Sequence, residues 1–434
     1  MNNQELLQRS LQSVWHPCTQ MKQHESMPLV PIKYGAGVWL YDFDGKRYLD
    51  AVSSWWVNLF GHNNTRIKSA IHQQLDQLEH VILAGFTHEP VVQLSEKLSQ
   101  LTGLGHAFYA SDGASATEIA LKMSFHYWRN HGQTNKTRFI SLQNSYHGET
   151  LGALGVTDVA IFKDTYAPLL VQSAQMPSPD SRLAEPGETA EAFAARCAQA
   201  LETYVAIHHH EIAAFIVEPL IQCAAGMGMY PTSYLKRARE ICNQYGVHLI
   251  VDEIAVGFGR TGTMFAFEQA GITPDFICLS KGITGGYLPL SVTLTRDEIY
   301  QAFYHDDVAR GFLHSHSYTG NALACAAALA TLQIFEDDHV LDTNRQKASM
   351  MNLHMTQLST LTIQHLRHQG MVWAFDVQTR DPAFQKNFYL AALQRGLILR
   401  PIGNTVYFMP PYIIDDSEMR WLVEQTYQIL TAMP

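Results

Sequence analysis

The sequence predicts an α/β protein with a mostly parallel central sheet in a large domain and a smaller α+β domain at the C-terminus. The chain has 434 residues, more than one compact core usually holds, so two closely packed domains are expected. Short apolar runs alternate with helical patterns in the middle of the chain, as parallel β/α units do. From about Thr331 this alternation gives way to a long helical stretch and shorter strand-like segments.

Several of the apolar runs are nearly continuous, which is typical of strands covered on both faces. The predicted strands of the large domain are Ala107–Ala110, Arg138–Leu142, Ala213–Val217, His248–Val251 and Phe276–Leu279. Helical patterns between them include Ser115–Arg129 and Pro231–Tyr245. In the tail, strands are expected within Gly370–Gln378, Gly396–Arg400 and Thr405–Met409.

We expect three parts along the chain. Residues 1–60 form an N-terminal arm that packs with the small domain, 61–330 form the large domain, and 331–434 form the small C-terminal domain. A turn is expected at Asp42–Gly45. The segment Pro177–Glu191 is rich in Pro, Ser and acidic residues and is predicted to be a surface loop.

The composition is that of a well-buried globular enzyme, with 47% hydrophobic and 16% charged residues. The net charge is −10 and no basic stretch is present, so nucleic acid is not an expected partner. The start lacks the apolar core of a signal peptide, and the longest apolar run, Ala322–Phe335, is too short to span a bilayer. The six cysteines are scattered without a CxxC pair, so a cytoplasmic protein with free thiols is expected.

Two histidine-rich runs resemble metal-binding tracts. His208–His210 has no second ligand cluster near it in the sequence, and a solvated helix end is the favoured interpretation. For the same reason, the run His314–His316 is not expected to be a metal site. The sequence therefore predicts no metal site.

Polar side chains gather where the predicted strands end. Asp252, Lys281 and Glu218 each follow an apolar run directly or within two residues. Tyr146 and the turn Asp112–Ser115 lie just past two further strands. Because open parallel sheets bind ligands at the carboxyl ends of their strands, these residues are expected at one rim.

An amine and a carboxylate at such a rim suit one kind of cofactor. Burial would make the Lys281 amine a nucleophile toward an aldehyde, and Asp252 could keep a pyridine nitrogen protonated so that the ring withdraws electrons. Each residue also has a plainer interpretation. Lys281 could reach the surface or pair with Asp252, and Asp252 could be a helix N-cap.

The turn at Asp112–Ser115 would suit a phosphate. Small residues at Gly113 and Ala114 let the backbone approach, and the first amides of the following helix favour an anion. Many turns begin helices in this way, so the motif alone is weak. Tyr146 could stack on an aromatic ring or be an ordinary core residue.

Taken together, these residues resemble the class III aminotransferases, the ornithine/ω-aminotransferase group of fold-type I pyridoxal-phosphate enzymes. The segment that carries the resemblance is LIVDEIAVGFGRTGTMFAFEQAGITPDFICLSKGITGGYLPLS, residues 249–291. The likeness continues in the segments IVEPLIQ, SYHGET and YTGNALACAAALA. It covers nearly the whole chain.

The resemblance implies a pyridoxal 5'-phosphate enzyme with defined roles. Lys281 would bind the cofactor covalently and move the proton at the substrate carbon. Asp252 would pair with the ring nitrogen, and Tyr146 would stack on the ring. The amides of Gly113 and Ala114 would hold the phosphate. Glu218 is also expected in the cofactor site.

The resemblance further implies an obligate homodimer with both sites at the interface. In this family the phosphate takes a hydroxyl group from the partner subunit, at the end of an H-G-x-[ST] run. The matching run here is His314-Ser315-His316-Ser317, so Ser317 and His316 would contact the cofactor and Ser315 the substrate. Ser315 replaces the family's usual glycine, which would let the backbone approach the substrate less closely.

Within the family, the closer likeness is to the branch that converts 8-amino-7-oxononanoate to 7,8-diaminononanoate in biotin biosynthesis, with S-adenosylmethionine or, in some relatives, lysine as amino donor. It is carried by Trp15-His16-Pro17, Ser53–Trp56, Arg400-Pro401 and Tyr407–Ile414. Cys18 departs from the branch, where an aromatic residue is often found. The alternative is another class III enzyme that acts on an ω-amino acid or a polyamine.

The likeness to this branch implies which residues bind the long substrate. Trp55, Trp56 and Tyr407 would line an apolar slot, and Arg400 would bind the distant carboxylate with its planar guanidinium. Without the resemblance, core packing would be favoured for the tryptophans and a surface ion pair for Arg400.

Overall fold

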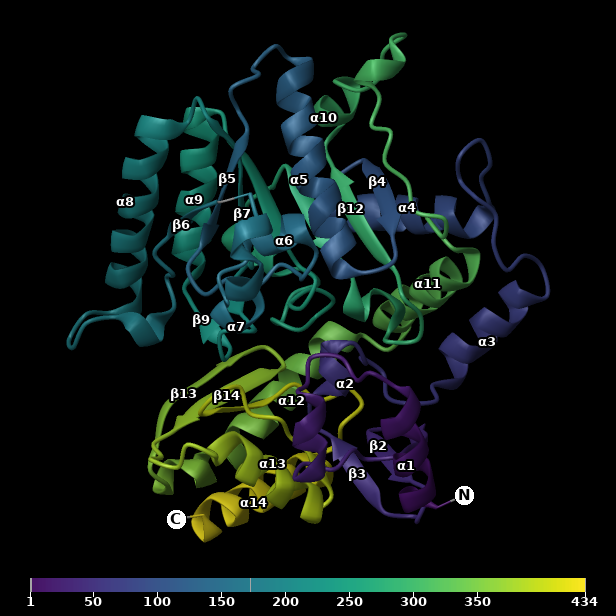
Figure 1. Ribbon diagram of the computed structural model, residues 1–434, viewed down its shortest axis with the longest axis vertical. Helices are drawn as coiled ribbons and strands as arrows, with labels where there is room; N and C mark the ends of the chain where they lie inside the picture. Colours follow the sequence, from purple (N-terminus) through teal and green to yellow (C-terminus); the bar gives the residue numbers. More distant parts are fainter. Residues whose placement is uncertain (1, 172, 434) are drawn as a thin grey trace. The chain divides into compact units, whose positions relative to one another are not determined.

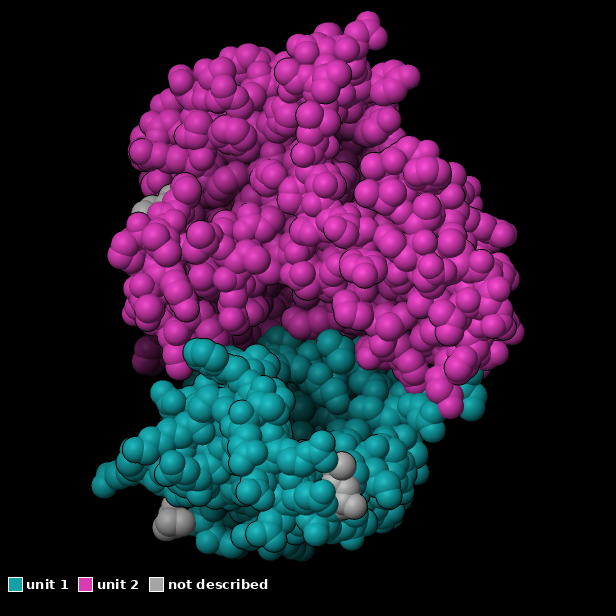
Figure 2. Space-filling model, turned by 45° about the vertical axis from the view of Figure 1, so that its right-hand side comes forward, with its two compact units in different colours: residues 1–65, 345–367, 371–434 teal, residues 66–344, 368–370 magenta. Residues whose placement is uncertain are grey.

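The computed structural model describes residues 2–171 and 173–433. The chain divides into two compact units, which Figure 2 shows in different colours. Unit 1 consists of residues 1–65, 345–367 and 371–434, and unit 2 of residues 66–344 and 368–370. The two ends of the chain thus build one unit, and the long middle segment builds the other (Figure 1).

Unit 2 contains a seven-stranded sheet with the order β4-β12-β11-β10-β7-β5-β6. Strand β12 is antiparallel to both of its neighbours, and the other strands run in one direction. The sheet is therefore mixed but mostly parallel. Its strands are β4 (His106–Ala110), β5 (Arg138–Leu142), β6 (Ala174–Met176), β7 (Ile212–Val217), β10 (His248–Asp252), β11 (Phe276–Leu279) and β12 (Ser291–Thr295). A separate two-stranded ribbon pairs β8 (Ile221–Gln222) with β9 (Gly228–Met229).

All five strands predicted for the large domain are present with ends that agree to within one residue. The sequence did not predict β6 or β12. Strand β12 alternates hydroxyl and apolar side chains, and all of its residues are buried. The hydroxyls of Thr293 and Thr295 donate to the carbonyls of Ala116 and Asp275. Internal hydrogen bonding therefore lets a strand of polar appearance lie within the sheet.

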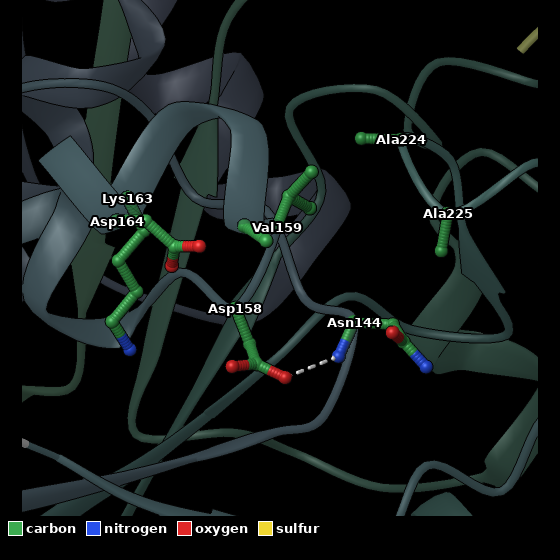
Figure 3. A pocket seen from close by; sticks show the side chains of 8 residues that line it. Asn144, Asp158, Val159, Lys163, Asp164, Ala224 and Ala225 are labelled. Atoms are coloured by element: carbon green, nitrogen blue, oxygen red, sulfur yellow. Dashed lines mark hydrogen bonds between the residues drawn. The ribbon is translucent and has the colours of Figure 1, made fainter.

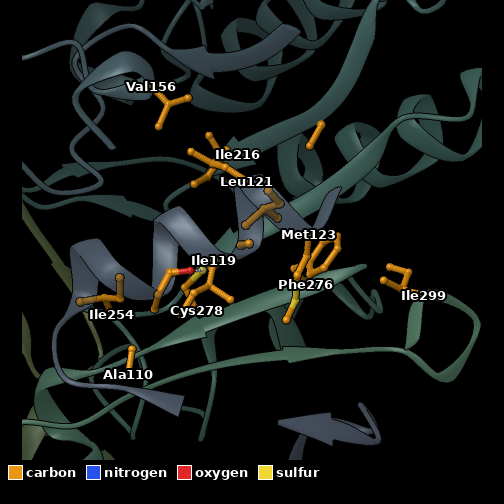
Figure 4. Packing of buried hydrophobic residues seen from close by; sticks show 14 residues of the cluster. Ala110, Ile119, Leu121, Met123, Val156, Ile216, Ile254, Phe276, Cys278 and Ile299 are labelled. Atoms are coloured by element: carbon orange, nitrogen blue, oxygen red, sulfur yellow. Dashed lines mark hydrogen bonds between the residues drawn. The ribbon is translucent and has the colours of Figure 1, made fainter. Parts of the chain in front are cut away.

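Helix α5 (Gly113–Asn130) supplies much of the core of unit 2. It packs against β7, β11 and β12, and Figure 4 shows its Ile119, Leu121 and Met123 among side chains from the sheet. Helices α8 and α9 lie side by side (Figure 1). The α-helices of unit 2 other than α5 are α3 (Thr65–Leu75, which begins at the boundary), α4 (Glu89–Thr102), α6 (Leu151–Val156), α7 (Ala160–Lys163), α8 (Ala190–His208), α9 (Thr232–Tyr245), α10 (Asp297–Gln301) and α11 (Ala322–Asp337).

Unit 1 contains two small sheets. One has the order β1-β2-β3-β15 and the other β13-β14-β16. The strands are β1 (Ile32–Ala36), β2 (Trp39–Asp42), β3 (Arg47–Asp50), β13 (Ile363–Gln369, whose last two residues belong to unit 2), β14 (Val372–Val377), β15 (Leu397–Ile398) and β16 (Thr405–Phe408). The helices are α1 (Asn3–Ser13), α2 (Ser53–Trp56), α12 (Val340–Met355, which begins in unit 2), α13 (Phe384–Gln394) and α14 (Asp416–Ala432).

Short 3₁₀ helices complete the description. They are η1 (Met21–Glu25), η2 (Asp164–Leu169), η3 (Ser181–Leu183), η4 (Ala266–Ala270), η5 (Lys281–Thr284), η6 (Val308–Arg310) and η7 (Thr356–Thr360). The expected turn at Asp42–Gly45 is present, because the Asp42 carboxylate accepts from the amides of Asp44 and Lys46. In the described part of the chain, no helix is both long and apolar enough to cross a membrane.

The prediction of a surface loop at Pro177–Glu191 is only partly right. Ser178 and Asp180 are buried, because Ser178 bonds to Gln222 and Asp180 pairs with Arg182. Helix α8 already begins at Ala190. The histidine run lies at the end of that helix, as predicted. Among the described residues, no group of three or more His, Cys, Asp or Glu is arranged to hold a metal ion.

A buried carboxylate ties the sheet to α9. Asp275, 1% exposed, precedes β11 and accepts from Arg239 Nη1 at 2.7 Å and from the Leu249 amide at 2.6 Å. Arg296, just past β12, also donates to it. Arg239 is itself buried, so its charge depends on this carboxylate for compensation.

We expect Asp275→Ala to lower the free energy of unfolding by about 3–5 kcal/mol, because the buried Arg239 would lose its counter-charge. Urea denaturation of the variant measures the loss. The exposed carboxylate of Asp306 provides the control, and Asp306→Ala should change stability by less than about 0.5 kcal/mol. A loss below about 1 kcal/mol for Asp275→Ala would contradict the compensating role.

Candidate functional site

The residues that the sequence places past the strands lie at one rim of the unit 2 sheet. Strands β4, β5, β7, β10 and β11 run in the same direction. Their carboxyl ends therefore meet at one edge, where ligands of open parallel sheets bind. Asp252 and Cys278 are aligned in the register of β10 and β11, and Lys281 follows three residues after Cys278.

Asp252 forms a buried pair with His147. The Asp252 side chain is at the end of β10, 4% exposed, and its Oδ2 lies 2.7 Å from His147 Nδ1. A carboxylate only accepts, so His147 Nδ1 carries the hydrogen. Oδ1 accepts from the Ile254 amide at 3.1 Å. His147 thus fixes the carboxylate. No role was assigned to His147 from the sequence. Its place directly after Tyr146, at the same rim of the sheet, was a signal for one.

Lys281 stands at the start of η5 with a φ of 47°. A non-glycine residue in this left-handed region stores strain of about 1–3 kcal/mol, and residues strained in this way cluster at functional sites. Burial lowers the pKa of its amine, while nearby Cys223, Asp252 and Glu218 act in the opposite direction. The net result is an amine that loses its proton more easily than an ordinary lysine does.

Glu218, which follows β7, is 5% exposed. Its carboxylate accepts from the amides of Tyr146 at 3.0 Å and Cys223 at 3.1 Å. Burial raises the pKa of Glu218 to about 7, and nearby Asp252 adds to the shift, while His147 and the two amides oppose it. Glu218 therefore anchors the Tyr146 segment from a neighbouring strand.

Tyr146 is held on two further sides. Its hydroxyl donates to Glu149 Oε1 at 2.9 Å, and its ring meets Phe162 edge-on with centroids 5.5 Å apart. A pocket of about 370 Å³ adjoins this segment, lined by Asn144, Asp158, Val159, Ala160, Lys163, Asp164, Ala224 and Ala225 (Figure 3). Across it the Asn144 amide donates to Asp158 at 3.0 Å. This hydrogen bond fixes the loop that precedes Tyr146.

The turn at Asp112–Ser115 does begin a helix, as predicted. Asp112 is the N-cap of α5, and its carboxylate accepts from both the amide and the hydroxyl of Ser115 at 2.9 Å. The amides of Gly113 and Ala114 are in the first turn, where no intrahelical carbonyl reaches them. A Cβ on Gly148 would lie 2.6 Å from Ala114 Cβ. Small residues are therefore required here.

The segment of residues 314–317 lies between η6 and α11. Lys122 Nζ is 2.8 Å from His314 Nδ1, and His314 Nε2 is 2.9 Å from His316 Nε2. The lysine can only donate, so His314 must be neutral and pass a hydrogen bond to His316. Ser315 and Ser317 are exposed, and His80 contacts the Ser317 carbonyl at 2.8 Å.

The other predicted substrate residues belong to unit 1, and the structure brings them together there. Trp56 Nε1 donates to the Tyr407 hydroxyl at 3.2 Å. The Arg400 guanidinium carbon lies 5.5 Å from the centre of the Trp55 ring. Trp56 and Tyr407 are buried, while Trp55 is 48% exposed. An aromatic wall and a cation are therefore adjacent in unit 1.

The tryptophans belong to a strained turn. Ser53, Ser54, Trp55 and Trp56 have φ values of 51°, 48°, 72° and 72°. A left-handed conformation costs L-residues roughly 1–2 kcal/mol each. Four in succession persist only when their surroundings hold them. The turn contains no glycine, so the sequence gives no signal of a left-handed conformation here.

The residues of unit 2 fit pyridoxal 5'-phosphate by their chemistry. A buried carboxylate suits a ring nitrogen, an amine of lowered pKa suits an aldehyde, and the start of α5 suits a phosphate. Asp252, Lys281, and Gly113 with Ala114 are the residues that would hold these three parts.

Comparisons with known proteins agree with this chemistry. The model of the aminotransferase class-III family matches residues 20–430. The chain therefore belongs to the class III aminotransferases, and pyridoxal 5'-phosphate is the cofactor of this enzyme class. The mostly parallel sheet is the fold-type I arrangement that the resemblance implied.

Particular relatives are more informative. The chain is 48% identical to the adenosylmethionine-8-amino-7-oxononanoate aminotransferase of Helicobacter pylori, over 100% of this chain and 99% of that protein. The crystal structure of the enzyme of that name from Methanocaldococcus jannaschii has a TM-score of 0.93 and 34% identity, and the match covers 99% of both chains. An omega transaminase from Pseudomonas jessenii in complex with PMP has a TM-score of 0.93 at 27% identity, over 98% of this chain and 97% of that chain.

The raised pKa of Glu218 predicts a pH dependence of stability. The folded apoprotein keeps a proton on Glu218 up to about pH 7, whereas the unfolded chain releases it near the ordinary pKa of 4.5. The stabilising contribution of this proton is therefore present below pH 4.5 and is lost as the pH rises through about 7.

Between these pH values, wild-type apoprotein should lose on the order of 2–3 kcal/mol relative to Glu218→Gln, which mimics the protonated form. Urea denaturation of both proteins across this range measures the difference. Parallel stability profiles for the two proteins would be inconsistent with the raised pKa.

Proposed function

We propose that the chain transfers an amino group to 8-amino-7-oxononanoate and produces 7,8-diaminononanoate, a step of biotin biosynthesis. The main support is the full-length similarity to enzymes of that activity at up to 48% identity. The cluster of Trp55, Trp56, Arg400 and Tyr407 in unit 1 is consistent with the same assignment.

The cofactor chemistry is assigned to residues of unit 2. When bound, pyridoxal 5'-phosphate supplies an electron-withdrawing ring and a carbon that carries the amino group between two substrates. Asp252, oriented by His147, would hold a proton at the ring nitrogen. Lys281 would bind the cofactor and, with its lowered pKa, move the proton at the substrate carbon. Tyr146, whose backbone amide donates to Glu218, would stack on the ring.

The phosphate is assigned to the start of α5 and to a second subunit. The amides of Gly113 and Ala114 would hold it in one subunit, and His316 and Ser317 would contact it from the other. On either side of residues 314–317, Tyr304, Leu313 and Tyr318 are exposed by 73%, 79% and 64%, and a homodimer interface would cover such side chains. No disulfide joins the cysteines within the described residues, which supports a cytoplasmic location.

The substrate residues are assigned to unit 1. The aromatic rings of Trp55, Trp56 and Tyr407 suit the apolar chain of a nine-carbon acid. Arg400 is exposed and can bind its carboxylate in bidentate fashion. Ser315, an exposed residue of unit 2, is a further residue assigned to the substrate. This pairing of an aromatic wall with an adjacent guanidinium disfavours an ω-amino acid or polyamine aminotransferase. The amino donor is S-adenosylmethionine, with lysine as the alternative that a donor screen distinguishes.

The test of the function is the absorbance of the cofactor-loaded protein. The visible band of the bound cofactor should fade when S-adenosylmethionine is added and return when 8-amino-7-oxononanoate follows. Lys281→Ala should abolish turnover while the apoprotein still folds, because the covalent attachment and the proton transfer are lost but the packing barely changes. If neither compound changes the band, the ω-aminotransferase alternative is favoured instead. Normal turnover by Lys281→Ala would exclude the proposed chemistry.

Arg400→Ala should raise the KM for 8-amino-7-oxononanoate by about 10- to 100-fold, the loss expected when a charged hydrogen-bonded partner is removed. The rate of the donor half-reaction should change little. Stopped-flow measurement of each half-reaction separates the two. Arg380→Ala, which removes an exposed arginine of the same unit, is the control. Equal losses in both half-reactions would argue against a carboxylate site at Arg400.

A further inference from the structure

The left-handed turn Ser53–Trp56 is a feature for which the proposed reaction gives no reason. Its four φ values all lie between 48° and 72° without a glycine. In this region the side chain crowds the following carbonyl oxygen. The turn carries Trp55 and Trp56 in different directions, one toward Arg400 and the other toward Tyr407. Something in unit 1 must hold this conformation.

Asp50 is the group that holds it. Its side chain is completely buried at the end of β3. Oδ1 accepts from the Ser54 amide at 2.9 Å, and Oδ2 accepts from the Ser54 hydroxyl at 2.6 Å. Both bonds are made to a residue of the strained turn, so one carboxylate fixes its backbone and side chain together.

His62 in turn holds Asp50. Its Nε2 lies 3.0 Å from Asp50 Oδ2, and its Nδ1 lies 3.2 Å from the Asn58 side-chain nitrogen. The backbone of His62 exchanges two hydrogen bonds with Gly37, at 3.1 and 2.7 Å. A Cβ on Gly35 would lie 2.5 Å from His62 Cβ. The imidazole is therefore fixed both by its backbone and by close packing.

The same stretch of chain also fixes the partners of the two tryptophans. Asp50 pairs with Ile398 in the register of β3 and β15, two residues before Arg400. The Ser53 hydroxyl donates to the Met409 carbonyl at 2.7 Å, and the Met409 amide donates to the Ala51 carbonyl at 2.9 Å. Strand β15, which precedes Arg400, and strand β16, which contains Tyr407, are thus held next to the residues that flank the turn.

We propose that Asp50 and His62 are positioning residues that determine specificity for the long-chain acceptor. They keep Ser53–Trp56 left-handed in the absence of substrate, so that Trp55 and Trp56 form a preformed wall beside Arg400 and Tyr407. The inference rests on the proposed function, because it assigns that wall to 8-amino-7-oxononanoate. A preformed wall avoids the ordering cost that a flexible turn would add to binding.

The experiment compares Asp50→Ala with Asp42→Ala in the full-length, cofactor-loaded protein. Asp42 is a matched control, because it is also buried in unit 1 and holds a turn, that of Asp44–Lys46. Asp50→Ala should raise the KM for the acceptor at least about 10-fold, as expected for small displacements of a binding wall. The kcat at saturating acceptor and the donor half-reaction should stay within about 3-fold. Asp42→Ala should leave all three nearly unchanged.

A second substitution tests the strain itself. In Asp50→Ala/Ser54→Gly, the glycine adopts the left-handed conformation without cost and should recover most of the acceptor affinity. Loss of packing alone would not be repaired by a glycine. If Asp50→Ala does not fold, His62→Leu replaces it, with His62→Gln as the conservative variant that can still donate to Asp50. His62→Leu should raise the acceptor KM, and His62→Gln should restore it.

Hydrogen exchange of the amides in residues 51–60 gives a readout that needs no substrate. These amides should lose protection in Asp50→Ala and keep it in Asp42→Ala. If wild type does not use 8-amino-7-oxononanoate, the proposed function fails, and with it the specificity role. Loss of protection would then still support the holding of the turn. Unchanged protection, or an acceptor KM that Asp50→Ala and Asp42→Ala alter equally, overturns the proposal.

Discussion

The hydrogen bond between His147 and Asp252 is the contact around which the candidate cofactor site is arranged. It joins the segment that follows β5 to the end of β10 across the intervening strand β7. A buried carboxylate without such a partner would favour its neutral form, and a neutral acid could not keep a ring nitrogen protonated. Glu218, at the end of β7, then holds the backbone next to His147. The ends of β5, β7 and β10 thus hold the candidate cofactor site together.

Much of this arrangement could be predicted from the sequence, for a physical reason. Parallel strands that are covered on both faces are recognisable as apolar runs, and polar residues directly after them must lie at the rim. The positions of Asp252, Lys281, Glu218 and Tyr146 at or just past the strand ends could be predicted in this way. The N-cap at Asp112 was also predictable, because small residues after an aspartate are a local signal of a helix start.

Other features depend on contacts that no local pattern encodes. Strand β12 escaped prediction because its threonines are satisfied by carbonyls distant in sequence. The pairing of His147 with Asp252 spans 105 residues. The left-handed turn at Ser53–Trp56 has no glycine, and its stabilisation by Asp50, His62 and Met409 becomes visible only in three dimensions. In each case tertiary contacts override the local preference.

The division of the chain has a consequence for biosynthesis on the ribosome. All strands of the central sheet lie between residues 106 and 295, so that sheet can form while the C-terminal segment is still being made. The pairing of β3 with β15 and the bond from Trp56 to Tyr407 join residues that are about 350 positions apart. The nascent chain therefore carries its first 65 residues without their C-terminal partners until translation is nearly finished, and the cluster of Trp55, Trp56, Arg400 and Tyr407 is among the last parts to be completed.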